Sequence, residues 1–201
     1  LEEDPAGTRI PAGRGNFEDN NNSLSLVGRL AWSPRPGFEL GASGHTGAYN
    51  VYTVDGLEVE ERRNLSIWVL DGEATVGGLE LRGEAALARI DVPPGLGPLF
   101  ADEQRGLYLD AVLPFARGLV ATMPASFLAA KLRLDFVDFD ADLRGDDVLR
   151  ISAGLNFHPS RDTAFKLDVF RARTHDRFNT PADEFGLLFS CLLYTSDAAD
   201  E

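Results

Sequence analysis

Alternation of apolar and polar residues is the feature that most constrains this chain, and it is clearest between Val148 and His158. The apolar positions are Leu149, Ile151, Ala153, Leu155 and Phe157, and the positions between them are Arg150, Ser152, Gly154, Asn156 and His158. Successive side chains of a β-strand point to opposite faces, so this period of two predicts one face for an apolar medium and one for water. Any half-exposed sheet would share this property, so the remainder of the chain has to indicate what the apolar face contacts.

The same alternation predicts nine strands, most of them close to the ~9–11 residues that a tilted strand needs to cross a bilayer. They span residues 24–33, 38–46, 65–74, 79–90, 106–115, 126–137, 148–158, 164–173 and 184–190. Short Pro- and Gly-rich turns at 34–37, 75–78 and 158–162 join strands in pairs, and the connection at 116–125 is longer. Long stretches at 1–22, 47–63, 91–105, 138–147 and 175–184 separate the pairs. Alternating short turns and long loops are typical of bacterial outer-membrane barrels.

We therefore expect an all-β fold, an antiparallel up-and-down transmembrane β-barrel, with about nine strands of a larger barrel in a single partial domain over residues 1–190. An odd number of strands favours a partial barrel, because single-chain bacterial barrels have even numbers. The chain starts at Leu1 with neither an initiator Met nor a signal-peptide pattern, which we interpret as a start within a longer protein. Residues 191–201, which include the only cysteine, Cys191, resemble translated adapter sequence, and we interpret them as a non-native tail.

Charge is concentrated in the expected long loops. The formal net charge is −13, and those five stretches carry 20 acidic and 7 basic residues, which also gives −13. The last stretch, 191–201, adds −3, and the strands with their short turns amount to +3. Such an acidic chain is not expected to bind nucleic acid.

The polar face of the expected strands carries charges of both signs, which a water-filled lumen accommodates without burying them in an apolar medium. We predict that this face lines the lumen and sets its selectivity. The predicted lumen residues are Arg29, Glu39, Arg82, Glu84, Asp110, Lys131, Arg133, Asp135, Arg150, Lys166 and Asp168. The solvent face of a soluble sheet would also accommodate them, so this pattern alone does not exclude a sandwich.

Aromatic residues flank two of the short turns on the apolar face. Trp32 and Phe38 flank the first turn, and Phe157 and Phe165 flank the last. Large rings at strand ends match the aromatic girdle of a membrane barrel, and we predict that role for these four. The alternative is that they cap one end of a sandwich core.

An acidic run, Asp138, Asp140 and Asp142, is the only segment that resembles a metal site. An EF-hand is excluded, because Leu143 stands where that loop requires Gly and Leu149 where it requires the bidentate acid. A loose surface site for Ca²⁺ or Mg²⁺ stays open beside the simpler interpretation as a solvated external loop. We expect no catalytic residues and no cofactor, because no acid, base and nucleophile converge in the sequence.

One region resembles a known family. The segment from Arg150 to Asp168 reads RISAGLNFHPSRDTAFKLD, and the segment from Leu134 to Asp140 reads LDFVDFD. Both are similar to strands near the end of porin-like proteins, of which the phosphate- and polyphosphate-selective porins of Gram-negative outer membranes are the best-known members. The resemblance implies the C-terminal part of a barrel of about 16 strands. It also implies a basic strip in the pore, to which Arg133, Arg150 and Lys166 could belong, whereas the acidic mouth would enrich cations.

We expect a porin-like channel in the bacterial outer membrane that lets ions or small hydrophilic solutes diffuse passively. Its partners would be membrane lipid, lipopolysaccharide and those solutes, and trimers are common among porins, which leaves a homotrimer open. Two alternatives remain. The first is a structural or adhesive outer-membrane barrel without transport, and the second is a soluble carbohydrate-binding β-sandwich, whose apolar faces would cover each other.

Overall fold

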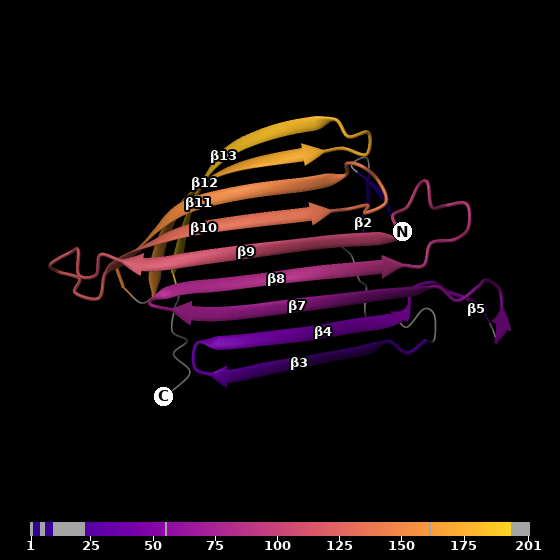
Figure 1. Cartoon of the computed structure of the whole chain (residues 1–201), viewed down its shortest axis with the longest axis horizontal. Helices are drawn as coiled ribbons and strands as arrows, with labels where there is room; N and C mark the ends of the chain where they lie inside the picture. The colour runs from indigo at the N-terminus through magenta and orange to yellow at the C-terminus, as the bar shows by residue number, and fades with distance from the viewer. Residues whose placement is uncertain (1, 5–6, 10–22, 55, 161, 194–201) are drawn as a thin grey trace.

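The protein forms one continuous antiparallel sheet. Its structure is a computed structural model that describes residues 2–4, 7–9, 23–54, 56–160 and 162–193, and this part of the chain is all-β with no helix. The sheet consists of β3 (Leu26–Arg35), β4 (Phe38–Ala48), β7 (Asn64–Val76), β8 (Leu79–Ile90), β9 (Glu103–Phe115), β10 (Phe127–Asp138), β11 (Asp147–His158), β12 (Thr163–His175) and β13 (Pro181–Leu193). Each strand pairs with the strand before and after it in this series, so the topology is up-and-down (Figure 1). This confirms the expected strand number and order.

Tight turns lie at one end of the sheet and long loops at the other (Figure 1). Between β7 and β8 the turn consists of Gly77 and Gly78, with φ of 58° and 86°. Two consecutive positive φ values are characteristic of a type I′ hairpin, which matches the twist of the flanking strands. Gly37, in the turn between β3 and β4, has φ of 75° and follows Pro36, which is the arrangement of a type II turn. We call the two ends the short-turn end and the long-loop end; the longer 116–126 connection lies at the short-turn end.

Two small hairpins lie in stretches that the sequence predicts to be loops. β1 (Glu2–Asp4) pairs with β2 (Gly7–Arg9), and β5 (Thr53–Val54) pairs with β6 (Leu57–Glu58). These two short pairs of strands add to the nine strands predicted for the sheet. Gly56, with φ of 80°, permits the tight reversal between β5 and β6. The remainder of the expected 1–22 loop, at 1, 5–6 and 10–22, lies outside the described residues.

Several strands extend further than the alternation predicts. β9 begins at Glu103 rather than 106, β12 ends at His175 rather than 173, and β13 begins at Pro181 rather than 184. The expected long loops are correspondingly shorter, because backbone pairing continues past the last apolar position into charged residues. β13 also continues through Cys191 to Leu193, in register with β12, and residues 194–201 of the expected tail lie outside the described residues.

The two faces of the sheet differ sharply in composition. Residues paired directly across antiparallel strands share a face, so the register assigns every side chain. The polar face carries the charged residues, and the apolar face carries most of the exposed large hydrophobics, including Leu109 (54% exposed), Leu132 (57%) and Ile151 (49%). No second layer of described residues covers the apolar face.

Most of the buried strand residues lie on the polar face rather than on the apolar one. Buried residues of that face are Ala88, Ile90, Ala129, Ser152, Asn156, Ala164, Phe170 and Ala172. On a curved sheet, side chains on the inside of the curve crowd together and those on the outside separate. We conclude that the sheet curves around its polar face.

Within the described residues, the two edge strands, β3 and β13, are each paired on one side only. β3 ends at the turn that leads into β4, and β13 begins after the loop that follows β12. Both edge strands therefore run from the long-loop end to the short-turn end. No helix among the described residues is long and apolar enough to cross a bilayer.

Candidate functional site

The register places all eleven predicted lumen residues on the polar face. Arg82, Asp110 and Arg133 are direct partners across β8, β9 and β10, and Asp135 is the direct partner of Arg150 on β11. Lys131 and Asp168 both lie opposite Gly154. Their roles in a lumen remain predictions, whereas their common face follows from the pairing.

Two adjacent rows of residues run across the strands and bring most of these charges together. One row contains Glu39, Glu73, Arg82, Asp110 and Arg133, and the next contains Asp71, Glu84, Tyr108, Asp135 and Arg150. The rows cross the middle of β9 and β10 and reach the short-turn end of β4, where Glu39 is the second residue. The site is therefore a belt of fixed charges across the polar face.

Two members of the belt, Asp71 and Glu73, were not among the residues predicted from the sequence. They lie on β7, where Ile67 and Val69 share their face. The large apolar residues Trp68 and Leu70 lie on the other face, so the alternation in this strand is weak. The sequence signal that identifies these two residues is the Asp-Gly-Glu segment at 71–73, where charged residues again occupy every second position.

A cluster centred on Arg29 anchors the belt on β3, β4 and β7. Arg29 forms a bidentate ion pair with Asp71, in which Nη2 donates to Oδ2 at 2.8 Å, and Glu39 lies 3.7 Å away. Ser33 Oγ donates to Glu39 at 2.9 Å. Gly41 lies beneath the pair, where a Cβ would approach Arg29 Nη2 and Asp71 Oδ2 to 2.6 Å. The absence of a side chain at Gly41 is therefore what allows the pair to form across β4.

Arg133 is the most constrained cation of the belt. Its Nη2 and Nε donate to Asp135 Oδ1 at 2.6 and 2.8 Å, and Asp110 lies 4.0 Å from Nη1. Its guanidinium lies 4.2 Å from the centre of the Tyr108 ring, close enough for a cation–π contact. These partners on β9 and β10 fix the charge in place rather than leaving it on a mobile side chain.

Arg150 is held by a ring instead of by a carboxylate. Its guanidinium lies 3.8 Å from the centre of the Phe170 ring on β12. Beside it is a hollow of about 410 Å³. Its lining consists of Lys131, Arg133, Asp135, Val137, Val148, Arg150, Ser152, Asp168 and Leu188. The hollow thus joins the basic residues of β10 and β11 and contains two carboxylates.

A second hollow, of about 310 Å³, lies on the other half of the belt. Its lining includes Arg29, Glu39, Asp71, Glu73, Arg82, Glu84 and Tyr108. Acidic residues predominate here, whereas basic residues predominate in the first hollow. Such an arrangement can attract, orient and repel charged solutes in water.

The predicted girdle residues all lie on the apolar face at the short-turn end. Trp32 and Phe38 are in edge-to-face contact with ring centres 6.2 Å apart. Phe157 and Phe165 are stacked with ring centres 6.5 Å apart. Phe115 extends the same border on β9. The rings therefore form an aromatic edge to the apolar face.

The acidic run at 138–142 is organised by arginines and backbone amides. Arg105 donates to Asp138 Oδ2 at 2.9 and 3.0 Å, and Arg177 lies 3.9 Å from Asp140. The backbone N–H of Asp142 donates to Asp140 Oδ1 at 3.3 Å. Burial raises the pKa of Asp140, and a side-chain hydrogen bond with Asp102 raises the pKa of Asp142. Within the described residues, no three His, Cys, Asp or Glu side chains are placed to hold a metal ion.

Neither the protein-family models nor the curated proteins nor the solved structures gave a match to this chain. Its function is therefore inferred from the two faces of the sheet and from the charges that they carry.

Proposed function

We propose that this chain forms part of an outer-membrane β-barrel that acts as a porin-like channel. Ions or small hydrophilic solutes diffuse passively through a lumen lined by the polar face, and the charged belt sets the selectivity. The apolar face contacts lipid.

The observation that carries this proposal is the width of the uncovered apolar face, which is the same on the four neighbouring strands β8, β9, β10 and β11. On β8, β9, β10 and β11, five successive positions of this face are apolar, and a charged residue follows at the long-loop end in each strand. Those charged residues are Arg89, Arg105, Asp138 and Asp147. Five alternate positions span about 26 Å along a strand. At a strand tilt of about 35–45° this length corresponds to a height of about 20 Å, which is within about 5 Å of the ~25 Å apolar band of outer-membrane barrels.

The band also runs obliquely across the strands. Phe38 ends the band on β4, and its cross-strand row passes through Leu81 and Leu132 to Val169 on β12. The aromatic residue that ends the band on β12 is Phe165, which precedes Val169 and lies nearer the short-turn end. A band of constant height crosses tilted strands in this way, and barrel strands are tilted by about 35–45°.

A soluble sandwich fits these faces less well. It would require a second apolar layer packed about 10 Å above the first, and the described residues supply none. Its buried residues would lie on the apolar face, whereas here most buried strand residues lie on the polar face. Both differences favour lipid as the neighbour of the apolar face.

The decisive experiment is single-channel recording of the full-length protein in a planar bilayer under a salt gradient. Discrete open steps are expected, and the reversal potential would show whether the acidic or the basic half of the belt dominates. Insertion without conductance would overturn the channel and favour a structural barrel. A protein that stays soluble and does not insert would overturn the barrel itself.

A further inference from the structure

The apolar face has two different borders. Aromatic rings form its border at the short-turn end, and charged side chains form its border at the long-loop end. We call the second one the charged border. It consists of Arg89, Glu103, Arg105, Asp138, Asp147, Arg171, Arg173, His175 and Asp183. The pairing register places all of these on the same face as the apolar band.

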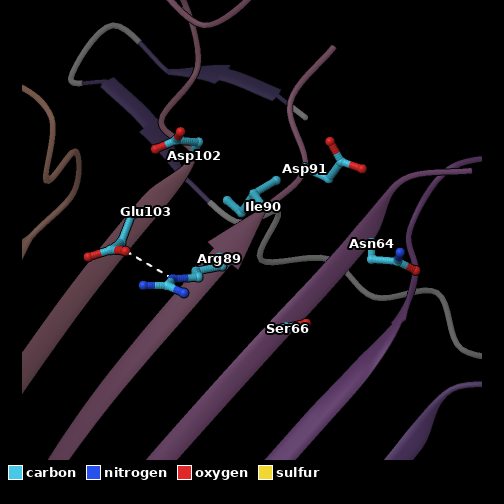
Figure 2. Close-up of a pocket in the computed structure, with 7 residues that line it drawn as sticks. All are labelled: Asn64, Ser66, Arg89, Ile90, Asp91, Asp102 and Glu103. Atoms are coloured by element: carbon cyan, nitrogen blue, oxygen red, sulfur yellow. Dashed lines mark hydrogen bonds and ion pairs between the residues drawn. The ribbon is translucent and has the colours of Figure 1, made fainter. Parts of the chain in front are cut away.

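On β8, β9 and β10 the charged border is neutralised by one-to-one pairs. Arg89 Nε donates to Glu103 Oε2 at 3.0 Å, and Figure 2 shows this pair on neighbouring strands next to Asp102. Arg105 and Asp138 form a second pair at 2.9 Å. Each of these arginines therefore has its own carboxylate, and no net charge is left over on β8, β9 and β10.

The border on β12 and β13 is different, because two arginines share one carboxylate. Arg171 Nη2 and Arg173 Nε both approach the same oxygen, Asp183 Oδ1, at 3.3 and 3.5 Å. The arginine side chains are 68% and 54% exposed. A guanidinium carries five N–H donors, so among the described residues most donors of this pair have no carboxylate partner, and the two arginines with Asp183 keep a net positive charge. The remaining carboxylate of the border, Asp147, lies 3.0 Å from His175 Nδ1.

Apolar side chains lie directly below this pair. Arg171 is the cross-strand partner of Phe185, which is 76% exposed, and the next partners toward the short-turn end are Val169 and Leu187. A positive charge set at the edge of an exposed apolar surface is complementary to an amphiphile with an anionic head. Guanidinium groups bind phosphate oxygens in bidentate fashion.

We propose that Arg171 and Arg173 bind the phosphate-bearing headgroup of a membrane lipid, whose acyl chains lie on Val169, Phe185 and Leu187. This inference rests on the proposed barrel, since it places the charged border at the level of the headgroups. A second copy of the chain docked by this same patch would bring like charge to it, which disfavours that occupant. The lipid supplies the negative charge that Asp183 alone leaves unmatched.

The test uses the full-length protein in detergent micelles, titrated with short-chain phosphatidic acid and, separately, with phosphatidylcholine of the same chain length. Native mass spectrometry counts the bound lipids. The double variant R171Q/R173Q should bind phosphatidic acid about 10- to 30-fold more weakly, since each surface arginine contributes to the attraction of anionic lipid. The matched control R89Q/E103Q removes an arginine together with its carboxylate and should bind as the wild type does.

Three results would overturn the inference. These are equal binding of phosphatidic acid by R171Q/R173Q and wild type, equal binding of both lipids by the wild type, and competition by inorganic phosphate at the same concentration as the lipid. A change in oligomeric state of R171Q/R173Q without a change in lipid binding would also overturn it, in favour of a protein partner. Insertion into vesicles of phosphatidylcholine alone is measured separately, so failure of the barrel is distinguishable from failure of the lipid site.

Discussion

Gly186 of β13 lies directly opposite Phe170 of β12, and a Cβ at Gly186 would lie 2.2 Å from the Cε1 atom of that ring. Phe170 is buried on the polar face, and its ring supports the guanidinium of Arg150 at 3.8 Å. Because Gly186 on β13 has no side chain, there is room for the Phe170 ring on β12. That ring in turn positions the guanidinium of Arg150 on β11. The orientation of Arg150 depends on a glycine two strands away.

We expect Gly186→Ala to destabilise the sheet by about 1–3 kcal/mol, because the added methyl group has to displace the Phe170 ring in a crowded site. Gly28→Ala is the matched control, since a Cβ at Gly28 meets no atom within 4 Å. The free energy of unfolding in urea, measured for both variants in the same micelles, checks the difference. Equal values for the two variants would contradict the packing described for β12 and β13.

A charge placed in the apolar band should prevent membrane assembly. Ile151→Arg and Leu155→Arg are expected to fail, because an arginine facing lipid near the midplane costs about 2–4 kcal/mol. Leu188→Arg is a close control, since Leu188 is 49% exposed, as is Ile151, but lies on the polar face opposite Asp168. Heat-modifiable migration on gels after refolding into vesicles measures assembly. Normal assembly of both band variants would contradict the assignment of the faces.

Reversing a charge of the belt should change ion selectivity while assembly stays intact. Arg133→Glu and Arg150→Glu are each expected to shift the reversal potential toward cations, because both side chains line the hollow on β10 and β11. Arg144→Glu makes the same charge change in an exposed loop and should shift the potential less. If neither belt variant moves the reversal potential, these residues do not line the conducting path.

Acid should loosen the loop between β12 and β13. The backbone N–H groups of Thr180 and Phe178 donate to Asp176 Oδ1 at 2.7 and 2.9 Å. The bond from Thr180 is the main reason that the pKa of Asp176 is below its usual value, although burial opposes it. A lowered pKa means that the ionised carboxylate of Asp176 stabilises the loop at neutral pH. This stabilisation is lost as the pH falls through the lowered pKa. Protection factors of these two amides should therefore fall in acid, and Asp176→Asn should remove that dependence.

The contact between Asp102 and Asp142 should respond to pH in the opposite direction. Their side-chain hydrogen bond raises the pKa of Asp142, so the shared proton stabilises the contact at low pH and is lost as the pH rises through the raised pKa. The amide of Ala141, which donates to the Glu103 carbonyl at 3.0 Å, reports on this loop. Its protection factor should fall as the pH rises, and Asp142→Asn should show no such change.

The alternation of the sequence was sufficient to predict the nine strands and the face of each charged residue where the period is regular, as it is from Val148 to His158. It failed on β7, where Trp68 and Leu70 obscure the period, so Asp71 and Glu73 were missed. On β12, Arg171 and Arg173 occupy positions of the apolar face, so the alternation does not indicate their role. Their common partner, Asp183 on β13, is identified only when the two strands are in register. The acidic run at 138–142 resembled a cation loop because its partners, Arg105 and Arg177, lie far away in the chain.

The directions of the two edge strands determine whether a closed barrel that contains this sheet has an even or an odd number of strands. β3 and β13 point the same way, so direct contact between them, in one copy or between two copies with the same orientation in the membrane, would be parallel. A ring made only of antiparallel pairs must insert an odd number of strands between them, and the total is then even. A strand that paired with the free edge of β13 would run from the short-turn end to the long-loop end. A strand that paired with the free edge of β3 would run the same way.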